Sequence, residues 1–357
     1  MQTSLARRQR RRRNGGQRPS TGKRAVAGVA IAVPLFLFGS FLVAGLVGAA
    51  GAVGAVSYYL QGLPDPKEYF ENLEFAEETR IYDRAGKTQL ATFAREARDV
   101  VDFDEIPAVV IAATTSIEDK TFWENAGFDP AGIVSAAVDT LSGNARGAST
   151  ITQQLVRNRL LPESAFTTTY ERKIREIIQS IRLTQAFPGE DGKKQILAAY
   201  LNDNFFGNNS YGIAAAARGY WNVPLEDLTV AQAAILAGIP QSPTTYDLMR
   251  NAIEEELPDG TTRLVVPMDS PIVQRRNRIL ELMKSRSVLT LGQYTTADYD
   301  AAMEEPVVLT PPEKRRMLAP HFVLPVRREL GAILCGSEAA DDCPAVDTGG
   351  YRVVTTL

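Results

Sequence analysis

The sequence predicts a mainly α fold that follows a single N-terminal transmembrane helix and has short β elements flanking it. Three observations lead to this prediction. An uncharged apolar stretch lies near the N-terminus, a helical pattern runs from Pro107 almost to Tyr246, and β-prone segments lie before and after that pattern. The chain has 357 residues, of which 45% are hydrophobic and 23% charged. It is therefore globular in composition and long enough for two or three structural units.

The N-terminal region separates into a basic tail and an apolar stretch. Residues 1–24 carry nine Lys or Arg and no acid, whereas residues 25–64 contain no Asp, Glu, Lys, Arg or His. About 20 apolar residues cross a bilayer, so we expect a transmembrane helix at 25–60. The basic flank predicts a cytoplasmic N-terminus with the rest of the chain outside. A cleaved signal peptide, the alternative, has an apolar region of only about 7–15 residues. We expect the arginine run to bind anionic lipid rather than nucleic acid.

Short β elements are expected on both sides of the helical region. Residues 79–83 and 88–93 have the pattern of two strands joined by a turn, which predicts a hairpin. A second turn at 258–260 separates a polar run from a β-prone run. Residues 350–357 have the composition of one further strand.

Few residues suit histidine or thiolate chemistry. His321 is the only histidine of the chain, which excludes a histidine-based catalytic triad and a zinc site. Cys335 and Cys343 lie in a Gly/Asp/Pro loop. They either form a small disulfide, which a location outside the cytoplasm allows, or remain free thiols.

The first candidate site is the segment Ile117-Glu118-Asp119-Lys120-Thr121-Phe122. Its adjacent carboxylates follow a predicted apolar helix and precede aromatic residues, so we expect Glu118 at the edge of a core. A partly desolvated carboxyl group is suited to general base catalysis. From this segment alone, a surface Glu-Asp pair at a helix end is an equally good interpretation.

The second candidate site is the segment from Gly147 to Gln154, where small and hydroxyl residues precede an apolar run. Thr150 and Gln153 fit a capping box, and Ser149 is an alternative cap. Capping does not explain the second glutamine or the two small residues that open the segment. We therefore expect a helix N-terminus whose free N–H groups bind phosphate.

Two basic segments follow. Isoleucines at 174, 177, 178 and 181 have helical spacing, and if they face the core, Arg172, Glu176 and Gln179 share another face. The alternative for Arg172 and Glu176 is a solvent-exposed i, i+4 ion pair. Further along the chain, Lys193 is either a solvated charge or a phosphate ligand, and Asn202 is a candidate turn cap.

Together these segments resemble, in order and spacing, the peptidoglycan glycosyltransferase domain (family 51) of class A penicillin-binding proteins. The family pattern consists of Glu-Asp-x-x-Phe-x-x-His-x-Gly-x-Asp, Gly-Gly-Ser-Thr-Ile-Thr-Gln-Gln-Leu-x-Lys-Asn, Arg-Lys-x-x-Glu and Lys-x-x-Ile-Leu-x-x-Tyr-Leu-Asn. The matching segments are 118–129, 147–158, 172–176 and 193–202, and a fifth similar segment is 231–238. The resemblance covers residues 79 to about 325.

The resemblance implies the following organisation. A lysozyme-like helical glycosyltransferase domain occupies 106–310; before it lie a basic cytoplasmic tail at 1–24, the transmembrane helix at 25–60 and a linker with a β-hairpin at 61–105. Residues 311–357 resemble a linker and the first strand leading to an absent transpeptidase domain. The only Ser-x-x-Lys, Ser20 to Lys23, is a chance match in the tail, and no Lys-Thr-Gly occurs. We therefore expect the front portion of a bifunctional enzyme, without transpeptidase activity or penicillin binding.

The resemblance also implies a reaction. Lipid II, a disaccharide-peptide on undecaprenyl pyrophosphate, would be polymerised into glycan strands by inverting transfer to the GlcNAc 4-hydroxyl, with release of undecaprenyl pyrophosphate. Glu118 would be the general base on that hydroxyl. Glu176 would act in the donor site near the pyrophosphate, where it is also the candidate ligand of a divalent cation, Mg²⁺ or Mn²⁺; no organic cofactor is implied. The other residues implied to bind substrate are Asp119, Phe122, Ser149, Thr150, Thr152, Gln153, Gln154, Arg157, Asn158, Arg172, Lys173, Lys193 and Asn202.

The expected partners are lipid II and the growing glycan strand, the lipid bilayer and other cell-wall synthesis proteins, but not nucleic acid. The expected location is the cell membrane, with a single pass and the catalytic domain outside the cytoplasm. The sequence departs from the family pattern at several positions: Asn125 replaces His, Ala148 replaces Gly, Ser135 replaces a frequent Arg, and Thr184 replaces a frequent acid. The alternatives are a membrane-anchored lysozyme-like hydrolase or lytic transglycosylase, which also uses a carboxylate, and an inactive scaffold for cell-wall assembly.

Overall fold

The computed structural model describes residue 54 and residues 57–141, 149–161, 170–286, 293–312 and 317–357. The chain divides into a unit at 1–62 and a unit at 63–357. The predicted basic tail and nearly all of the predicted transmembrane helix fall outside the described residues. Among the helices that are described, none is both long and apolar enough to cross a membrane.

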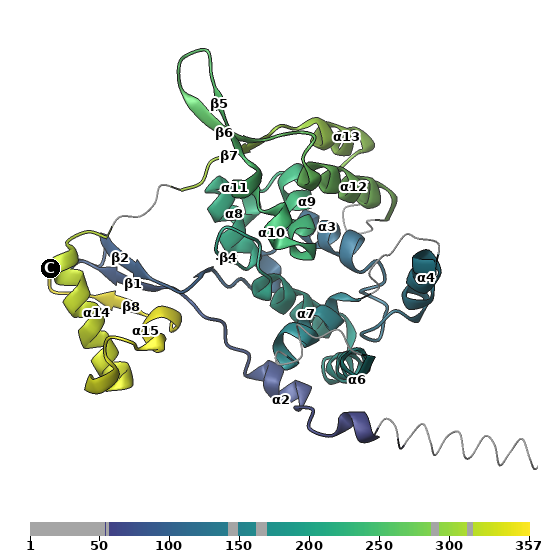
Figure 1. The fold of residues 1–357 in the computed structure, drawn as a ribbon, viewed down its shortest axis with the longest axis horizontal. Coiled ribbons are helices and arrows are strands. Elements are labelled where there is room, and N and C mark those ends of the chain that lie inside the picture. The colour runs from purple at the N-terminus through teal and green to yellow at the C-terminus, as the bar shows by residue number, and fades with distance from the viewer. Residues whose placement is uncertain (1–53, 55–56, 142–148, 162–169, 287–292, 313–316) are drawn as a thin grey trace, which may run out of the picture. The chain divides into compact units, whose positions relative to one another are not determined.

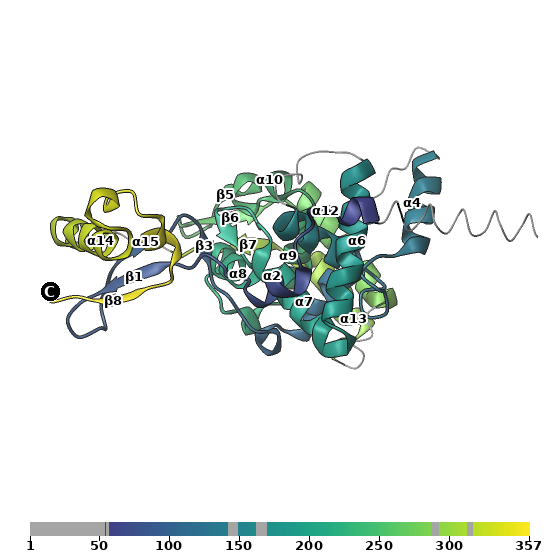
Figure 2. The ribbon, with the colours of Figure 1, turned by 90° about the horizontal axis from the view of Figure 1, so that it is seen from below.

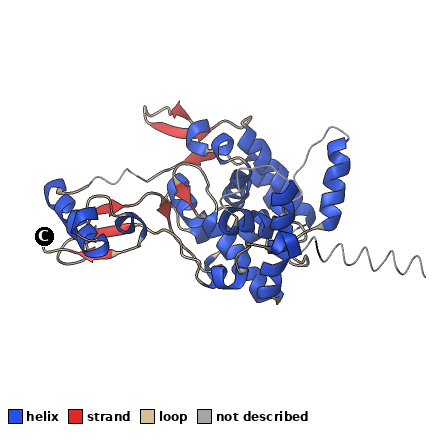
Figure 3. Cartoon of the chain, turned by 60° about the horizontal axis from the view of Figure 1, so that its bottom comes forward, coloured by secondary structure: helices blue, strands red, loops and turns tan. Residues whose placement is uncertain are grey.

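Helices dominate the described part of the chain, as the sequence predicts, and the strands form only small sheets (Figures 1 and 3). The helices that build the first hydrophobic core and its surroundings are α2 (Pro66–Glu71), α3 (Ala108–Glu118), α4 (Pro130–Leu141), α5 (Ile151–Leu155), α6 (Tyr170–Ala186), α7 (Gly189–Asp203), α8 (Ile213–Trp221), α9 (Val230–Gly238), α10 (Pro243–Tyr246), α11 (Leu248–Asn251), α12 (Pro271–Arg286) and α13 (Thr296–Glu304). A π-helical turn, Val156–Leu160, continues α5.

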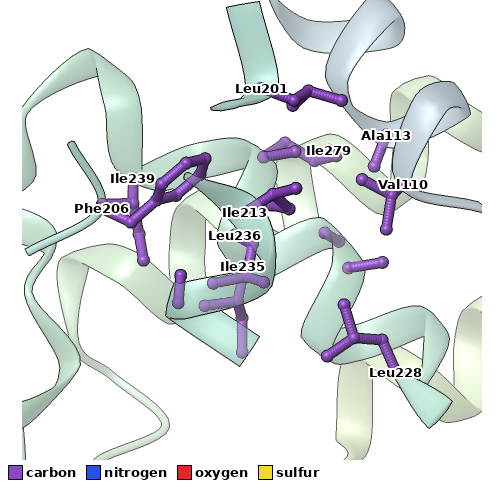
Figure 4. Packing of buried hydrophobic residues seen from close by; sticks show 14 of the residues in the cluster. Val110, Ala113, Leu201, Phe206, Ile213, Leu228, Ile235, Leu236, Ile239 and Ile279 are labelled. Atoms are coloured by element: carbon purple, nitrogen blue, oxygen red, sulfur yellow. The ribbon is translucent and has the colours of Figure 1, made fainter. Parts of the chain in front are cut away.

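The centre of this core is α3, which is buried from Val109 to Ser116. Its small residues, such as Ala113, allow α9 and α12 to pack closely against it. Val110 and Ala113 belong to one buried cluster with Leu236 of α9 and Ile279 of α12 (Figure 4). Burial of nearly its whole length makes α3 a central core helix, and Glu118 lies at the end of this buried stretch.

Small β elements accompany the helices. Strands β5 (Ile253–Glu256), β6 (Thr262–Val266) and β7 (Val307–Leu309) form an antiparallel sheet, and the predicted turn at 258–260 joins the first two. Strands β3 (Ala97–Arg98) and β4 (Ser210–Tyr211) form a short parallel pair. Part of the predicted linker also packs on helices, since the Phe70 ring lies 4.9 Å from that of Phe187.

A second, smaller core lies around the predicted N-terminal hairpin. Strands β1 (Thr79–Tyr82) and β2 (Gln89–Phe93) pair antiparallel, and β8 (Arg352–Val354) adds to β1 in parallel. Helices α14 (Pro320–Cys335) and α15 (Pro344–Thr348) lie on one face of this sheet (Figure 2). Cys335 and Cys343 form a disulfide in this region, which settles the alternative left open by the sequence.

The predicted orientation of α6 is wrong. The four isoleucines are only partly buried, whereas Glu176, Gln179 and Ser180 are almost fully buried. The polar face can be buried because its groups are paired. Glu176 is ion-paired, Gln179 donates to the Pro64 carbonyl at 3.0 Å, and the Ser180 hydroxyl donates to the Glu176 carbonyl at 2.6 Å. Burying a polar group costs little free energy when the group is hydrogen-bonded or ion-paired. The paired polar face of α6 is therefore buried in preference to the face that carries the isoleucines.

Candidate active site

Glu118 is the last residue of α3, where the buried helix meets a polar region. The chain leaves the helix at Asp119, the C-cap residue. Gln154 Nε2 donates to Glu118 Oε2 at 2.8 Å, and Arg275 Nη2 donates to Oε1 at 3.1 Å. The Glu118 side chain is 11% exposed to solvent. Each carboxylate oxygen therefore has one oriented donor and keeps lone pairs for another partner.

The second glutamine of the Gln-Gln pair has the contact that capping does not explain. Thr150 and Gln153 form the predicted capping box at the start of α5. Gln154 lies next along the helix and binds Glu118 through its nitrogen, while its Oε1 accepts from the Tyr200 hydroxyl at 3.2 Å. Burial raises the pKa of Tyr200, and the negative charge of Glu118 raises it further. The tyrosine therefore remains a neutral donor.

Glu176 lies in a separate cluster of charges on α6. Arg172 pairs with its Oε1, and Lys173 Nζ lies 3.1 Å from its Oε2. The same Lys173 ammonium donates to Ser149 Oγ at 2.8 Å, which joins α6 to the residue before the α5 cap. Burial lowers the pKa of Lys173 to about 8, and the positive charges of Arg157 and Arg172 contribute. The cluster thus concentrates positive charge around one buried carboxylate.

The segment after Glu118 contains a third polar cluster, which is internal. Asp119 and Lys193 are 6% and 4% exposed, and Asn125 lies between them, with its amide nitrogen on Asp119 and its amide oxygen on Lys193. The Lys193 ammonium also lies 4.7 Å from the ring centroid of Phe122, which is itself fully buried. Lys193 is therefore not a solvated charge, and Phe122 is a core residue in this structure.

Several predicted binding residues lie inside the fold rather than beside Glu118 or Glu176. Thr152 and Gln153 are fully buried. Asn202 exchanges two hydrogen bonds with the backbone of Val101, at 3.1 and 2.8 Å, so it holds a loop instead of capping a turn. Asn158 is exposed and accepts a hydrogen bond from its neighbour Arg157. Gly147 and Ala148 lie outside the described residues.

Sequence reasoning missed Arg275, which is the second donor to Glu118. It lies on α12, and its Nε donates to the carbonyl of Gly238, the last residue of α9, at 2.8 Å. Its guanidinium lies 5.7 Å from the ring centroid of Tyr246. In the sequence, Arg275 is one of five consecutive basic or polar residues on an amphipathic helix, and nothing local distinguishes it from Arg278.

The residues around Glu176 do not fit a resident divalent cation. Both carboxylate oxygens of Glu176 already face cationic side chains. In the parts of the chain that the structure describes, no group of three or more His, Cys, Asp or Glu side chains is placed to hold a metal. Divalent cations take several oxygen ligands, whereas in this structure both oxygens of Glu176 are paired with Arg172 and Lys173.

Comparison with known proteins identifies the family. A family model described as Transglycosylase matches residues 86–284, more than half of the chain. The chain belongs to this transglycosylase family. Penicillin-binding protein 1A/1B of Bacillus subtilis (strain 168) is 34% identical over 344 residues, which cover 95% of this chain and 34% of the relative. Penicillin-binding protein 1A of Rickettsia felis is 32% identical over 323 residues, covering 89% of this chain and 36% of the relative.

A crystal structure of penicillin-binding protein 1A from Haemophilus influenzae is 22% identical, with a TM-score of 0.37; the alignment covers 79% of this chain and 27% of that one. The chain thus spans about a third of the length of the curated relatives it matches. The predicted identity, a glycosyltransferase domain of the class A penicillin-binding protein type, is confirmed. Glu118, Glu176 and Arg275 all lie within the matched transglycosylase region.

Proposed function

We propose that this transglycosylase-family chain polymerises lipid II into peptidoglycan glycan strands while anchored in the cell membrane by its apolar segment at 25–60. The anchor is supported by the absence of Asp, Glu, Lys, Arg and His from residues 25–64 and by the length needed to cross a bilayer. A membrane location suits a donor that carries an undecaprenyl chain. The catalytic unit would then work at the outer face of the cell membrane, with cell-wall synthesis proteins as further partners.

The observation that carries this proposal is the placement of Glu118. A general base must present an oriented carboxylate to the hydroxyl it deprotonates. The end of the buried helix α3 fixes the backbone of Glu118, and Gln154 and Arg275 fix its two oxygens. Glu118 would accept the proton of the acceptor 4-hydroxyl as that oxygen attacks the anomeric carbon of the donor. Attack opposite the leaving group inverts the configuration at that carbon.

The charge cluster on α6 would meet the leaving pyrophosphate. Departure of undecaprenyl pyrophosphate transfers the bonding electron pair to a phosphate oxygen, so negative charge grows there. Arg172 and Lys173 are held beside Glu176, and Arg157 is close enough to influence Lys173. Pre-oriented cations stabilise developing charge without reorganisation. In this proposal Glu176 holds the two cations in place, and no proton donor is needed for the leaving group.

The metal requirement follows from the same cluster. Since Arg172 and Lys173 supply the positive charge, we expect polymerisation to continue when a chelator removes free divalent cations. The rate with excess chelator should stay within about threefold of the rate in Mg²⁺. Loss of activity on chelation, with recovery on adding Mg²⁺ or Mn²⁺, would show that a cation enters with the pyrophosphate.

The alternative activity, glycan cleavage, is separated from synthesis by the product. The full chain, reconstituted in vesicles, is incubated with fluorescent lipid II and, in parallel, with purified sacculi. We expect glycan polymers from lipid II and no shortening of sacculus glycan. Fragments from sacculi without polymer from lipid II would replace the proposed function with a lysozyme-like hydrolase or lytic transglycosylase. If neither polymer nor glycan fragments are formed, the result would favour an inactive scaffold.

A further inference from the structure

Asn125 occupies the centre of the internal polar cluster that follows Glu118. Its Nδ2 donates to both carboxylate oxygens of Asp119, at 2.9 and 3.1 Å. Its Oδ1 accepts from Lys193 Nζ at 3.1 Å and from the N–H of Gly127 at 2.9 Å. Exchanging the amide oxygen and nitrogen would set donors against donors on one side and acceptors against acceptors on the other. The orientation of this amide is therefore fixed by its partners.

Two of the loop residues that Asn125 binds, Asp119 and Gly127, also hold the beginning of α5. The N–H of Ile151, the first residue of α5, donates to Asp119 Oδ2 at 3.2 Å. The hydroxyl of Thr150, the N-cap, donates to the Gly127 carbonyl at 2.7 Å. Asn125 thus joins both attachment points of α5 to a single side chain.

Helix α5 in turn carries a donor to the proposed base. Gln154 lies one turn into the helix and donates to Glu118 at 2.8 Å. A shift of the helix start would move this donor relative to Glu118, because Gln154 lies only one turn beyond the cap residue Thr150. Positional errors of about 1 Å can reduce the rate of an enzyme about 100-fold.

Asn125 also links two buried charges of opposite sign. Lys193 reaches it from α7, and Asp119 reaches it from the end of α3. Burial lowers the pKa of Lys193 and raises that of Asp119, and each charge partly offsets the effect on the other. Buried charges persist when they are paired and hydrogen-bonded. One neutral amide forms hydrogen bonds with both charges here.

We propose that Asn125 is a positioning residue for the transfer reaction, fixing α5 and thereby the Gln154 donor on Glu118. Lys193 is then the buried counter-charge of Asp119, connected through Asn125, rather than a phosphate ligand. The expected effect of Asn125 on catalysis rests on the proposed function. The role of Asn125 in holding the start of α5 does not depend on that function.

The first experiment replaces Asn125 by leucine, which keeps the branched shape of the side chain and removes the hydrogen bonds of the amide. In the full chain we expect kcat for lipid II to fall about 10- to 100-fold with KM within about threefold of wild type. Hydrogen exchange of the Ile151 amide should become faster. Asn72→Leu, at an exposed position before the glycosyltransferase motifs, is the control and should change neither quantity. Asn125→Leu with wild-type exchange at Ile151 would overturn the proposal.

The second experiment remains informative if the leucine variant fails to fold. In Asn125→His, a neutral imidazole can donate to Asp119 and accept from Lys193. A protonated imidazole has two N–H donors and no acceptor, so it can no longer accept from Lys193, and its positive charge repels the Lys193 ammonium. The charged groups facing this position are Asp119 from the end of α3 and Lys193 from α7; α5 contributes only the neutral Ile151 N–H and Thr150 hydroxyl. The ratio of variant to wild-type kcat should therefore rise with pH between about 5.5 and 7.5.

The two claims fail in different ways. A ratio that stays constant over that pH range would exclude the proposed role of Asn125, whatever the absolute rates. If the wild-type chain makes no polymer, the proposed function fails, and the claim about α5 is decided by Ile151 exchange alone. In that case the histidine variant should show faster exchange at the lower pH than at the higher pH, relative to wild type.

Discussion

Arg275 donates a hydrogen bond to Glu118 from 157 positions later in the chain, with Nη2 3.1 Å from Oε1. The contact joins α12 to the end of α3, and the same guanidinium also binds the carbonyl that ends α9. Three central helices therefore meet at the proposed general base. The orientation of Glu118 depends on the packing of the whole core and not only on its own segment.

Replacing Arg275 by lysine tests this dependence. A lysine keeps the charge but has no fork that reaches Glu118 and the Gly238 carbonyl together. We expect kcat for lipid II to fall about 10- to 100-fold because the carboxylate loses its orientation. Arg278→Lys on the exposed face of the same helix is the matched control and should retain wild-type activity. Equal activity of the two variants would show that Arg275 has no role in orienting Glu118.

Lys173 predicts an alkaline limit to activity. Its pKa is lowered to about 8 by burial and by neighbouring Arg157 and Arg172, so its positive charge is lost as the pH rises through about 8. The free enzyme then binds pyrophosphate less well, and kcat/KM should decline above that pH. In Lys173→Arg the decline should shift to a pH at least about one unit higher, because a guanidinium stays protonated. Lys120→Arg, at an exposed position, should leave the decline in place.

The contribution of Lys173 to the stability of the fold should increase with pH, whereas its contribution to activity decreases. Because the folded pKa of about 8 lies below the unfolded value of 10.5, the unfolded chain binds more protons between these values. The contribution of Lys173 to the free energy of unfolding therefore increases with pH across that window. A parallel drop in thermal midpoint and activity would attribute the alkaline limit to unfolding instead.

The disulfide between Cys335 and Cys343 is expected to stabilise the small core around β1, β2 and β8. It closes a loop with a sequence separation of 8, and Cys343 is buried in that core. Loop closure of this length stabilises a fold by about 2.5 kcal/mol. Replacing both cysteines by alanine should lower the thermal midpoint by several degrees and leave lipid II turnover at about 25 °C unchanged. An unchanged midpoint would show that the disulfide contributes nothing to stability.

The local features of the site could be predicted from the sequence. The apolar run of α3, the position of Glu118 at its end and the capping box of Thr150 and Gln153 depend on residues within a few positions of one another. The hairpin of β1 and β2 and the turn at 258–260 could be predicted for the same reason.

The remaining features depend on contacts between distant segments. Parallel pairing of β8 with β1 joins opposite ends of the described chain, and the recruitment of Arg275 is equally non-local. For α6, isoleucine spacing predicted the wrong buried face because ion pairs and hydrogen bonds made the burial of Glu176 and Gln179 favourable. The role of Lys193, a solvated charge or a phosphate ligand, could not be decided from the sequence because its partner Asn125 lies 68 positions away.

The most direct test of Glu118 as the general base is the rate of lipid II consumption by Glu118→Gln in the full chain. The amide keeps the size of the side chain but cannot accept the proton of the acceptor hydroxyl, and a general base contributes about 10²- to 10⁴-fold to the rate. We predict a loss of about 100-fold or more with a thermal midpoint within a few degrees of wild type, while Glu124→Gln, at a nearby exposed position, stays active. Wild-type turnover in Glu118→Gln would contradict the assignment of Glu118 as the base.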